Sequence, residues 1–200
     1  SDVTNTEGDL SITVATLTVT TESAEKAYDG TALKADGTVT GYKNSETATF
    51  TVTGSQTAVG ESTNSYTLVF DQSAVSTDYT VDEDLGTLKV TEDKTKLTIV
   101  SATASKEYDG TALTVPTYTI TYGEDRGEAT ANEDGTYSYK LSTNDVITIT
   151  PAESATVTHV AEGTVKNAFS YTLENAEYYS DVTNTEGDLS ITVATRSEEH

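Results

Sequence analysis

Short stretches of the chain alternate between apolar and polar residues. Leu10, Ile12 and Val14 are separated by single polar residues, and this period of two is typical of a β-strand with one buried face. After residues 15–16 the phase changes, because the next apolar residues occupy odd positions, beginning with Leu17. A shift of one residue turns side chains to the opposite face of a strand. The pattern therefore predicts that the chain leaves one hydrophobic core here and enters another.

The same change of phase recurs further along the chain. Leu88 and Val90 are followed, after the polar residues 91–96 (TEDKTK), by Leu97 and Ile99. We interpret residues 91–96 as a domain boundary. At both positions a last strand runs almost directly into a first strand, so we expect modules that stack end to end through short, stiff junctions.

Further alternating stretches, separated by Gly and polar clusters, predict the remaining strands. In the first module they cover residues 17–21, 38–42, 47–53, 66–70, 79–81 and 86–90, and in the second they cover residues 97–100, 117–122, 136–141, 146–150, 156–160, 169–173 and 188–193. Thr makes up about a fifth of the sequence and favours exposed antiparallel sheet. We therefore expect an all-β protein made of two tandem β-sandwich modules.

Two stretches of the sequence are repeated. Residues 26–33 (KAYDGTAL) return as residues 106–113 (KEYDGTAL), 80 positions later, and residues 1–16 (SDVTNTEGDLSITVAT) return unchanged as residues 180–195, 179 positions later. Such self-similarity indicates an array of structural units, each of which folds in the same way.

The repeats define the domain organisation that we expect. Residues 1–16 are interpreted as the terminal strand of a preceding repeat, residues 17–93 as the first β-module and residues 97–195 as the second. A strand that has lost its sheet can pair with a neighbouring molecule, so we expect strand exchange through residues 1–16. Residues 196–200 (RSEEH) break the pattern and are interpreted as a cloning scar with the start of a histidine tag.

The repeated YDG sequence is interpreted as a folding element. Asp-Gly favours a turn, because Gly adopts positive φ and the Asp side chain bonds backbone amides two residues on. We expect the rings of Tyr28 and Tyr108 to cover one end of each core, with the hydroxyl bound to a backbone group. Recurrence within a repeat favours this structural role over a binding site.

Composition narrows the possible functions. The net charge is −22, from 33 acidic and 11 basic side chains, and such a surface repels nucleic acids and anionic membranes. The sequence has no Cys, so disulfides and thiolate metal sites are excluded. No apolar run approaches the roughly 20 residues of a membrane span. Both the cytosol and the surface of a bacterium are compatible with this composition.

The second module is longer than the first. Leu33 and Tyr66 are 33 positions apart, whereas Leu113 and Tyr171 are 58 positions apart, so the second module has 25 extra residues. We place this insertion near residues 121–145, where residues 123–135 form a polar loop or the tip of a β-hairpin. Aromatic side chains often carry contact energy, and the candidate ligand contacts here are Tyr122, Tyr137 and Tyr139.

Acidic clusters raise the question of metal binding. The candidate ligands are Asp82, Asp84, Asp125 and Asp134, which lie close to turn residues, and Ca²⁺ requires six to eight oxygen ligands from a loop that can wrap around it. The clusters do not match the EF-hand spacing. A solvated acidic face is the favoured interpretation, so no cofactor is expected and Ca²⁺ is the alternative.

Catalysis has few candidate residues. His159 is the only His before the C-terminal residue, no Cys nucleophile is present, and no Gly-rich phosphate loop follows a strand. Scattered carboxylates on an exposed β-surface are a poor acid–base pair. We therefore do not expect an enzyme.

Four stretches resemble a known family of repeats. Besides residues 26–33, they are residues 53–60 (TGSQTAVG), 78–81 (DYTV) and 86–91 (GTLKVT). Together they resemble the YDG-type tandem repeats of giant surface proteins and adhesins of Gram-positive bacteria. The resemblance covers essentially all of the first module, and in the second it holds at residues 106–113 and 170–195. It implies a small Ig-like β-domain in a cell-wall-anchored, extracellular protein. β-Grasp-like modules are the alternative fold.

Surface domains of such bacteria sometimes join a Lys amine to an Asn amide beside a buried carboxylate. The candidates for this isopeptide cross-link are Lys26 with Asn64 and Lys106 with Asn167. The alternative is a Lys stem that lies over the edge of the core with its ammonium group in water.

These observations lead to two functional hypotheses. The first is a structural stalk or spacer that contacts neighbouring repeats in the same chain and projects an adhesive region from the cell wall. The second is that the repeats themselves bind a host protein, a glycan or another bacterial surface ligand through the insertion of the second module.

Overall fold

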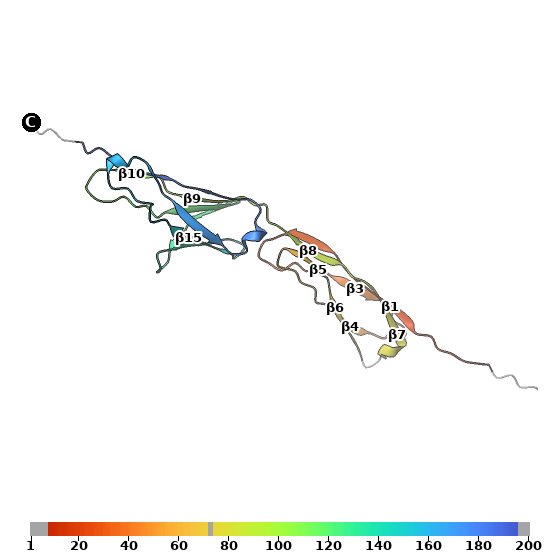
Figure 1. Ribbon diagram of the computed structural model, residues 1–200. Helices are drawn as coiled ribbons and strands as arrows, with labels where there is room; N and C mark the ends of the chain where they lie inside the picture. Colours follow the sequence, from red (N-terminus) through yellow and green to blue (C-terminus); the bar gives the residue numbers. More distant parts are fainter. Residues whose placement is uncertain (1–7, 72–73, 196–200) are drawn as a thin grey trace, which may run out of the picture. The chain divides into compact units, whose positions relative to one another are not determined.

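The computed structural model describes residues 8–71 and 74–195, and its regular secondary structure is almost entirely β-strand (Figure 1). The chain divides into two compact units. Unit 1 comprises Ser1–Lys26 and Ala32–Val90, and unit 2 comprises Ala27–Thr31 and Thr91–His200. The expectation of an all-β protein is confirmed. Over the described ranges, no helix is long and apolar enough to cross a membrane.

Unit 1 contains three sheets. The first has the order β3-β1-β7, the second β2-β8-β5, and β4 pairs with β6. Leu17, Val19, Leu88 and Val90 are almost completely buried and alternate with polar residues, as the sequence pattern predicts. The strand bounds are β1 Ala15–Thr21, β2 Ala24–Ala27, β3 Gly37–Thr40, β4 Ala48–Val52, β5 Gly60–Thr63, β6 Tyr66–Phe70, β7 Tyr79–Asp84 and β8 Thr87–Thr91, with a 3₁₀ turn at Ser76–Asp78.

Unit 2 has two four-stranded sheets, β12-β11-β9-β18 and β13-β14-β15-β17, and a third sheet, β10-β19-β16. Its strands are β9 Leu97–Ser101, β10 Ala104–Glu107, β11 Tyr118–Tyr122, β12 Asp125–Glu128, β13 Thr130–Ala131, β14 Tyr137–Lys140, β15 Val146–Pro151, β16 Val165–Lys166, β17 Phe169–Leu173, β18 Val182–Thr185 and β19 Asp188–Thr192. Two 3₁₀ turns occur at Val160–Glu162 and Ala176–Tyr178. The fully buried Tyr118 joins the four-stranded sheets, because its ring contacts those of Tyr137 at 5.3 Å and Phe169 at 5.4 Å.

The first strand of each unit pairs in parallel with the next-to-last strand, and in unit 2 the second strand pairs in parallel with the last. In unit 1, β1 lies beside β7 with Leu17 opposite Val81. In unit 2, β9 lies beside β18 and β10 lies beside β19. The prediction of antiparallel sheet from the Thr content is therefore only partly correct, because some strands pair in parallel. A high Thr content indicates exposed β-structure, but it does not indicate the direction in which strands pair.

A buried Asn holds the bend between consecutive terminal strands of unit 2. The amide nitrogen of the Asn167 side chain donates to the carbonyl oxygens of Ala102 and Val115, at 2.9 and 2.8 Å. The Ser101 hydroxyl donates to the carbonyl of Asn167 at 2.6 Å and accepts the Gly187 N–H at 2.9 Å. A Cβ at Gly187 would lie 2.3 Å from the carbonyl oxygen of Ala102, so this close approach requires Gly.

Unit 1 has the same arrangement, which we call the Asn clamp in both units. The Thr21 hydroxyl donates to the carbonyl of Asn64 at 2.7 Å and accepts the Gly86 N–H at 2.9 Å. The Asn64 side chain donates to the carbonyls of Glu22 and Ala35 at 3.0 and 3.2 Å. Both Asn side chains are buried, with 0% exposure for Asn64 and 1% for Asn167. Each clamp therefore satisfies several backbone groups that would otherwise be buried without partners.

Two of the strand predictions are wrong. Residues 8–14 form no strand, and Leu10 and Ile12 are completely exposed; an alternating pattern forms a stable strand only where a sheet accepts it. Residues 156–160 are not a strand either, although Val157 is fully buried and forms an isolated bridge with Leu113. Apolar periodicity therefore identified a core residue but not its backbone conformation.

The insertion also differs from its prediction. The predicted single loop or hairpin tip is instead two hairpins, because β11 pairs with β12 and β13 pairs with β14. β11 and β14 belong to different four-stranded sheets.

The division of the chain into two units falls at Val90–Thr91, next to the predicted boundary at 91–96. Nothing in the sequence indicated that Ala27–Thr31 belongs to unit 2. The interpretations of residues 1–7 and 196–200 lie outside the described residues.

Candidate functional site

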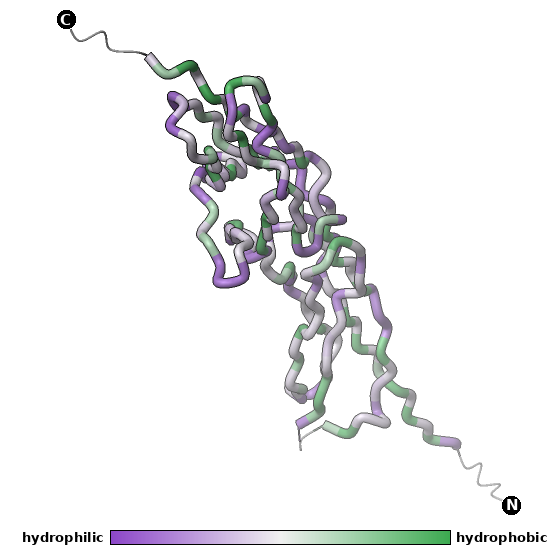
Figure 2. Tube along the Cα trace, turned by 60° about the vertical axis from the view of Figure 1, so that its left-hand side comes forward, coloured by the Kyte–Doolittle hydropathy of each residue, from purple (hydrophilic) through white to green (hydrophobic). Residues whose placement is uncertain are grey.

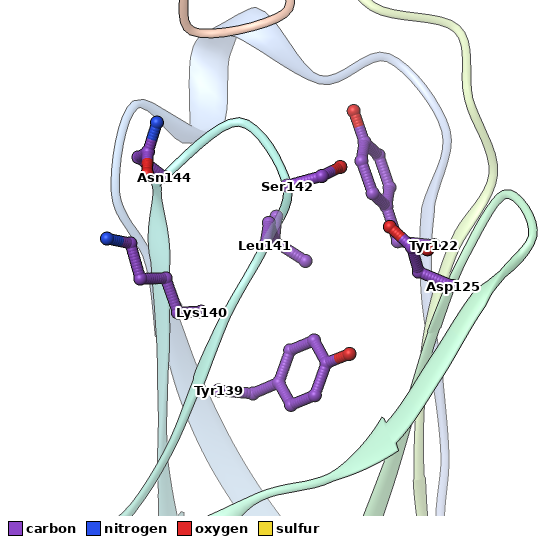
Figure 3. A pocket seen from close by; sticks show the side chains of 7 residues that line it. All are labelled: Tyr122, Asp125, Tyr139, Lys140, Leu141, Ser142 and Asn144. Atoms are coloured by element: carbon purple, nitrogen blue, oxygen red, sulfur yellow. The ribbon is translucent and has the colours of Figure 1, made fainter.

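The candidate site is a pocket of about 400 Å³ in unit 2 (Figure 3). It lies where the end of β11 and the start of β12 approach the end of β14 and the turn that follows it. Its lining residues are Tyr122, Asp125, Tyr139, Lys140, Leu141, Ser142 and Asn144. All of them come from the insertion near residues 121–145, and two of the three predicted ligand contacts, Tyr122 and Tyr139, are among them.

Tyr139 and Tyr122 line the pocket from different sheets. Tyr139 lies on β14, opposite Ile147 of β15, and Tyr122 ends β11, opposite Leu97 of β9. The Tyr139 side chain lies against Gly127 of β12, since a Cβ at Gly127 would meet ring atom Cε2 of Tyr139 at 2.7 Å. Gly127 therefore leaves space that allows the Tyr139 ring to cross from one sheet to the other.

The turn after β14 alternates between exposed and buried side chains. Ser142 and Asn144 are exposed and line the pocket, whereas Leu141, Thr143 and Asp145 are buried. The turn is closed by a hydrogen bond from the Leu141 N–H to the Asp145 carbonyl at 2.9 Å, and Asn144 has a positive φ of 77°. Asn tolerates this left-handed conformation better than most residues.

Behind this turn, Asp145 is the acceptor for three side chains of unit 2. Its Oδ2 accepts the hydroxyl groups of Tyr28 at 2.9 Å and Tyr179 at 2.6 Å. Its Oδ1 accepts the Asn175 side-chain amide at 2.8 Å. Thr143 Oγ1 lies 2.6 Å from the Tyr179 hydroxyl. We call these five residues the Asp145 cluster.

Burial and the neighbouring carboxylates keep the Tyr hydroxyls protonated. Desolvation, followed by the hydrogen bond to Asp145, raises the pKa of Tyr28 to about 12. The same two causes raise the pKa of Tyr179 well above its ordinary value. Burial and a hydrogen bond to Asp93 likewise raise the pKa of Tyr122. These phenols are therefore hydrogen-bond donors at physiological pH and are not poised to act as bases or nucleophiles.

The two copies of the YDG turn have the same local structure. Asp29 Oδ1 accepts the N–H and hydroxyl of Thr31 at 2.8 and 2.7 Å, and Asp109 binds Thr111 in the same way at 2.9 and 2.8 Å. Gly30 and Gly110 have positive φ values of 77° and 81°. The predicted turn is confirmed in both copies.

The environments of the two copies differ. Tyr28 is 6% exposed, and its ring contacts those of Tyr178 and Tyr179. Tyr108 is 41% exposed, and its ring lies 5.9 Å from that of His159. The prediction that each Tyr covers a core therefore holds for Tyr28 alone, and its hydroxyl binds the carboxylate of Asp145 rather than the predicted backbone group.

Tyr137, the third predicted ligand contact, lies elsewhere. With Tyr118 it lines a second pocket of about 430 Å³. Tyr137 and Tyr139 are two positions apart on β14, but each lines a different pocket. The insertion therefore does not bring the three predicted Tyr side chains together at one site.

The cross-link candidates have separate hydrogen-bond partners in unit 2. Lys106 Nζ donates to Asp109, Thr111 and the carbonyl of Ala112 at 2.9, 2.6 and 3.3 Å, and this contact lowers the pKa of Asp109. Asn167 is held in its clamp. In unit 1, Lys26 belongs to β2 and Asn64 to the corresponding clamp. The cross-link stays a prediction, and the clamps are a role for both Asn residues that sequence reasoning missed.

The candidate metal ligands do not form a common site. Asp82 and Asp84 lie on β7 of unit 1, Asp125 begins β12, and Asp134 accepts the N–H and hydroxyl of Thr136 within its own turn. Over residues 8–71 and 74–195, no three His, Asp or Glu side chains are grouped so that they could hold a metal ion.

The pocket is lined by two aromatic rings, by short polar side chains and by the cationic side chain of Lys140. Tyr139 and Leu141 offer apolar surface, while Asp125, Lys140 and Ser142 offer hydrogen-bonding groups (Figure 3). This chemistry suits recognition of a hydroxyl-rich or peptide-like ligand more than a chemical step. No protein-family model matches the chain, and a comparison with curated proteins gave no significant match.

Proposed function

We propose that this chain is a spacer from a bacterial cell-surface adhesin, and that its two Ig-like β-sandwich units hold an adhesive region away from the cell wall. In this role the protein is extracellular and bears tension between its ends. The parallel pairing of the first strand with the next-to-last strand in each unit is the observation that carries the proposal. The high negative charge, the sequence repeats and the lack of Cys are consistent with it.

The strand directions explain why such a unit suits a tandem array. In unit 2 the parallel ladders run from Leu97 opposite Val182 to Glu107 opposite Thr192. The chain therefore enters at one end of this ladder and leaves at the other, on the order of 30 Å away at the usual rise of a strand. The same argument applies to unit 1, where β1 and β7 are parallel.

Parallel terminal strands also resist tension well. A force applied along such a pair acts in shear, so several ladder hydrogen bonds must break together before the strands separate. The Asn clamp of unit 2 adds bonds where β9 passes into β10 and β18 passes into β19. We infer that the ladders and the clamps set the force at which each unit opens.

Single-molecule stretching tests this proposal. A Thr183→Pro variant disrupts the ladder at the position where β18 faces Thr98 of β9, because Pro lacks the N–H. We expect a marked fall in the unfolding force of one unit. Arg126→Pro is the control, because it alters β12 at the opposite edge of the same sheet. An equal fall in both variants would contradict the proposed role of the terminal ladder.

The pocket favours a second candidate function, in which the repeat itself binds a host protein or a glycan. Its two Tyr side chains and its polar rim come from the insertion that distinguishes the second module. Binding to glycan and protein arrays by the intact chain should then be lost in Tyr139→Ala and retained in Tyr171→Ala, which alters a residue outside this pocket. No binding by the intact chain would leave the spacer role as the better proposal.

A further inference from the structure

One nine-residue sequence occurs in two different environments. Residues 8–16 and 187–195 are both GDLSITVAT. In the second copy, Leu189 and Ile191 of β19 are 0% and 5% exposed. In the first copy, the equivalent Leu10 and Ile12 are 102% and 100% exposed. Residues 8–14 of the first copy lie outside the strands of unit 1 as an extended segment with alternating hydropathy (Figure 2), and residues 15–16 begin β1.

The position of β19 shows what this sequence binds when it is buried. β19 lies between β10, to which it is parallel, and β16, to which it is antiparallel. Leu189 stands opposite both Ala104 and Val165. Its side chain and that of Ile191 belong to a cluster with Val157, against which Ala104, Leu113, Val115 and Val165 pack.

Polar groups fix the register of β19 as well. Lys166 Nζ bonds Asp188 at 2.7 Å, and the Asp188 N–H donates to the Thr103 hydroxyl at 3.1 Å. The Thr195 N–H donates to Glu107 Oε1 at 2.7 Å. Asp188 has an identical counterpart, Asp9, in the first copy, so the first copy can make the Asp188 contacts in the same register. The counterpart of Thr195 is Thr16, which already belongs to β1 and lies opposite Thr80. A one-residue slip would turn Leu and Ile out of the core.

We propose that residues 8–14 are a donor strand for the site between β10 and β16 in a second copy of this chain. The site accepts the donor when that copy's own β19 is displaced. The partner is defined by sequence identity, because the donor reproduces every side chain that fills the site. The inference does not depend on the spacer role.

Covalent linkage determines which strand fills the site in the intact protein. β19 is tethered to unit 2 and therefore has a high effective concentration at its own site, whereas the donor of another molecule must reach it by diffusion. Since the apolar contacts of the two strands in the site are the same, the tethered strand is favoured. The intact chain therefore keeps its own β19 in the site. A chain with a disabled β19 has both a free donor strand and an open acceptor site. The donor of one molecule can then bind the acceptor of the next, and such heterologous contacts form a head-to-tail chain of molecules.

The test uses the full chain with matched variants. Leu189→Asp with Ile191→Asp disables β19, and Leu10→Asp with Ile12→Asp disables the donor. Sedimentation should show concentration-dependent assembly of the first double variant. The second double variant, and the variant with all four substitutions, should remain monomeric. Assembly that persists in the quadruple variant would overturn the proposal, because the donor is then not responsible.

A synthetic peptide of residues 1–16 provides a second test, which measures peptide binding and remains informative even where the variant folds poorly. Added to the Leu189→Asp, Ile191→Asp chain, it should fill the open site, dissociate the assemblies into monomers and raise the melting temperature of unit 2. A peptide with the same composition in scrambled order should do neither. If the peptide of native order leaves both the mass and the melting curve unchanged, the donor-strand proposal is wrong.

Discussion

At the scale of single residues, the same amino acid has different roles in the two copies of a repeat. Gly30 and Gly110 share a positive φ, yet their surroundings differ. A Cβ on Gly30 would lie 1.9 Å from the carbonyl oxygen of Thr143, whereas a Cβ on Gly110 would meet nothing within 4 Å. At position 30, glycine is therefore required both by the positive φ and by the close approach of Thr143. At position 110, only the positive φ favours glycine.

This difference predicts unequal costs for the same substitution. Gly110→Ala should lower the free energy of unfolding by about 1 kcal/mol, the cost of a left-handed Ala. Gly30→Ala should cost about 2–3 kcal/mol more, because the Thr143 backbone must move and the Asp145 cluster is disturbed. Urea unfolding of the two variants measures both values. Equal costs would show that Gly30 is not closely packed against Thr143.

The Asp145 cluster predicts sensitivity to alkaline pH. The pKa of Tyr28 is raised from 10.0 to about 12 in the folded protein. The folded state thus retains a proton that the unfolded state loses, so this contribution to stability is complete below pH 10 and is lost as pH rises through about 12. Tyr28→Phe should be less stable near neutral pH and show a shallower decline over this range.

Tyr108→Phe is the matched control for the pH experiment. It alters the second copy of the same motif, where the ring is 41% exposed and lies outside the Asp145 cluster. Its unfolding free energy should follow that of the parent chain from neutral to alkaline pH. A decline as steep in Tyr28→Phe as in the parent chain would contradict the assigned role of the Tyr28 hydroxyl.

At the scale of elements, the Asn clamps hold the bends of the terminal strands. Removal of the Asn167 side chain would leave the half-buried carbonyl of Ala102 without a donor, and the carbonyl of Val115 would keep only the Thr117 N–H. Each unsatisfied buried carbonyl costs roughly 1–3 kcal/mol. The strand bends therefore depend on a side chain that lies outside the strands themselves.

Asn167→Ala should accordingly destabilise unit 2 by about 2–4 kcal/mol, and Asn64→Ala should have a similar effect on unit 1. Asn132→Ala is a suitable control, because Asn132 lies in an exposed turn and donates to the Thr136 hydroxyl. Calorimetry should show a lower melting temperature for each clamp variant and almost none of this effect for the control. A small effect in both clamp variants would refute the role of the clamp.

At the scale of the whole molecule, charge is the dominant property. The chain carries a net charge of −22, so repulsion between carboxylates opposes the compact state. Within the described ranges, the ion pairs that salt would weaken include exposed ones, such as Lys89 with Glu61 at 3.7 Å and Lys166 with Asp188 at 2.7 Å. Exposed pairs of this kind contribute little to stability.

Added NaCl should therefore raise the melting temperature by a few degrees, because it screens the repulsion more than it weakens the attractive pairs. Differential scanning calorimetry at low and high NaCl concentrations measures the change, and a sugar at matched osmolality controls for general solute effects. A melting temperature that falls with salt would mean that the ion pairs outweigh the net repulsion.

Local sequence patterns were sufficient to predict the class of the fold, the repeats and the chemistry of the turns. Period-two alternation identified Leu17, Val19, Leu88 and Val90 as core residues, because the two faces of a strand have different surroundings at every second position. The Asp-Gly turns were equally predictable, since a side chain and a backbone two residues away decide them. Tyr122 and Tyr139, two of the three Tyr residues predicted as ligand contacts, line a pocket that the insertion forms, but the pocket itself was not predicted.

Only the tertiary structure decided which segments meet. Parallel pairing of terminal strands, the two Asn clamps and the Asp145 cluster join residues that are far apart in the chain, and no local pattern encodes such contacts. The clearest case is GDLSITVAT, which at residues 8–16 is an exposed segment that leads into β1, and which at residues 187–195 contains the buried β19. The sequence is the same in both places, and the presence of β10 and β16 on either side decides whether it becomes a strand.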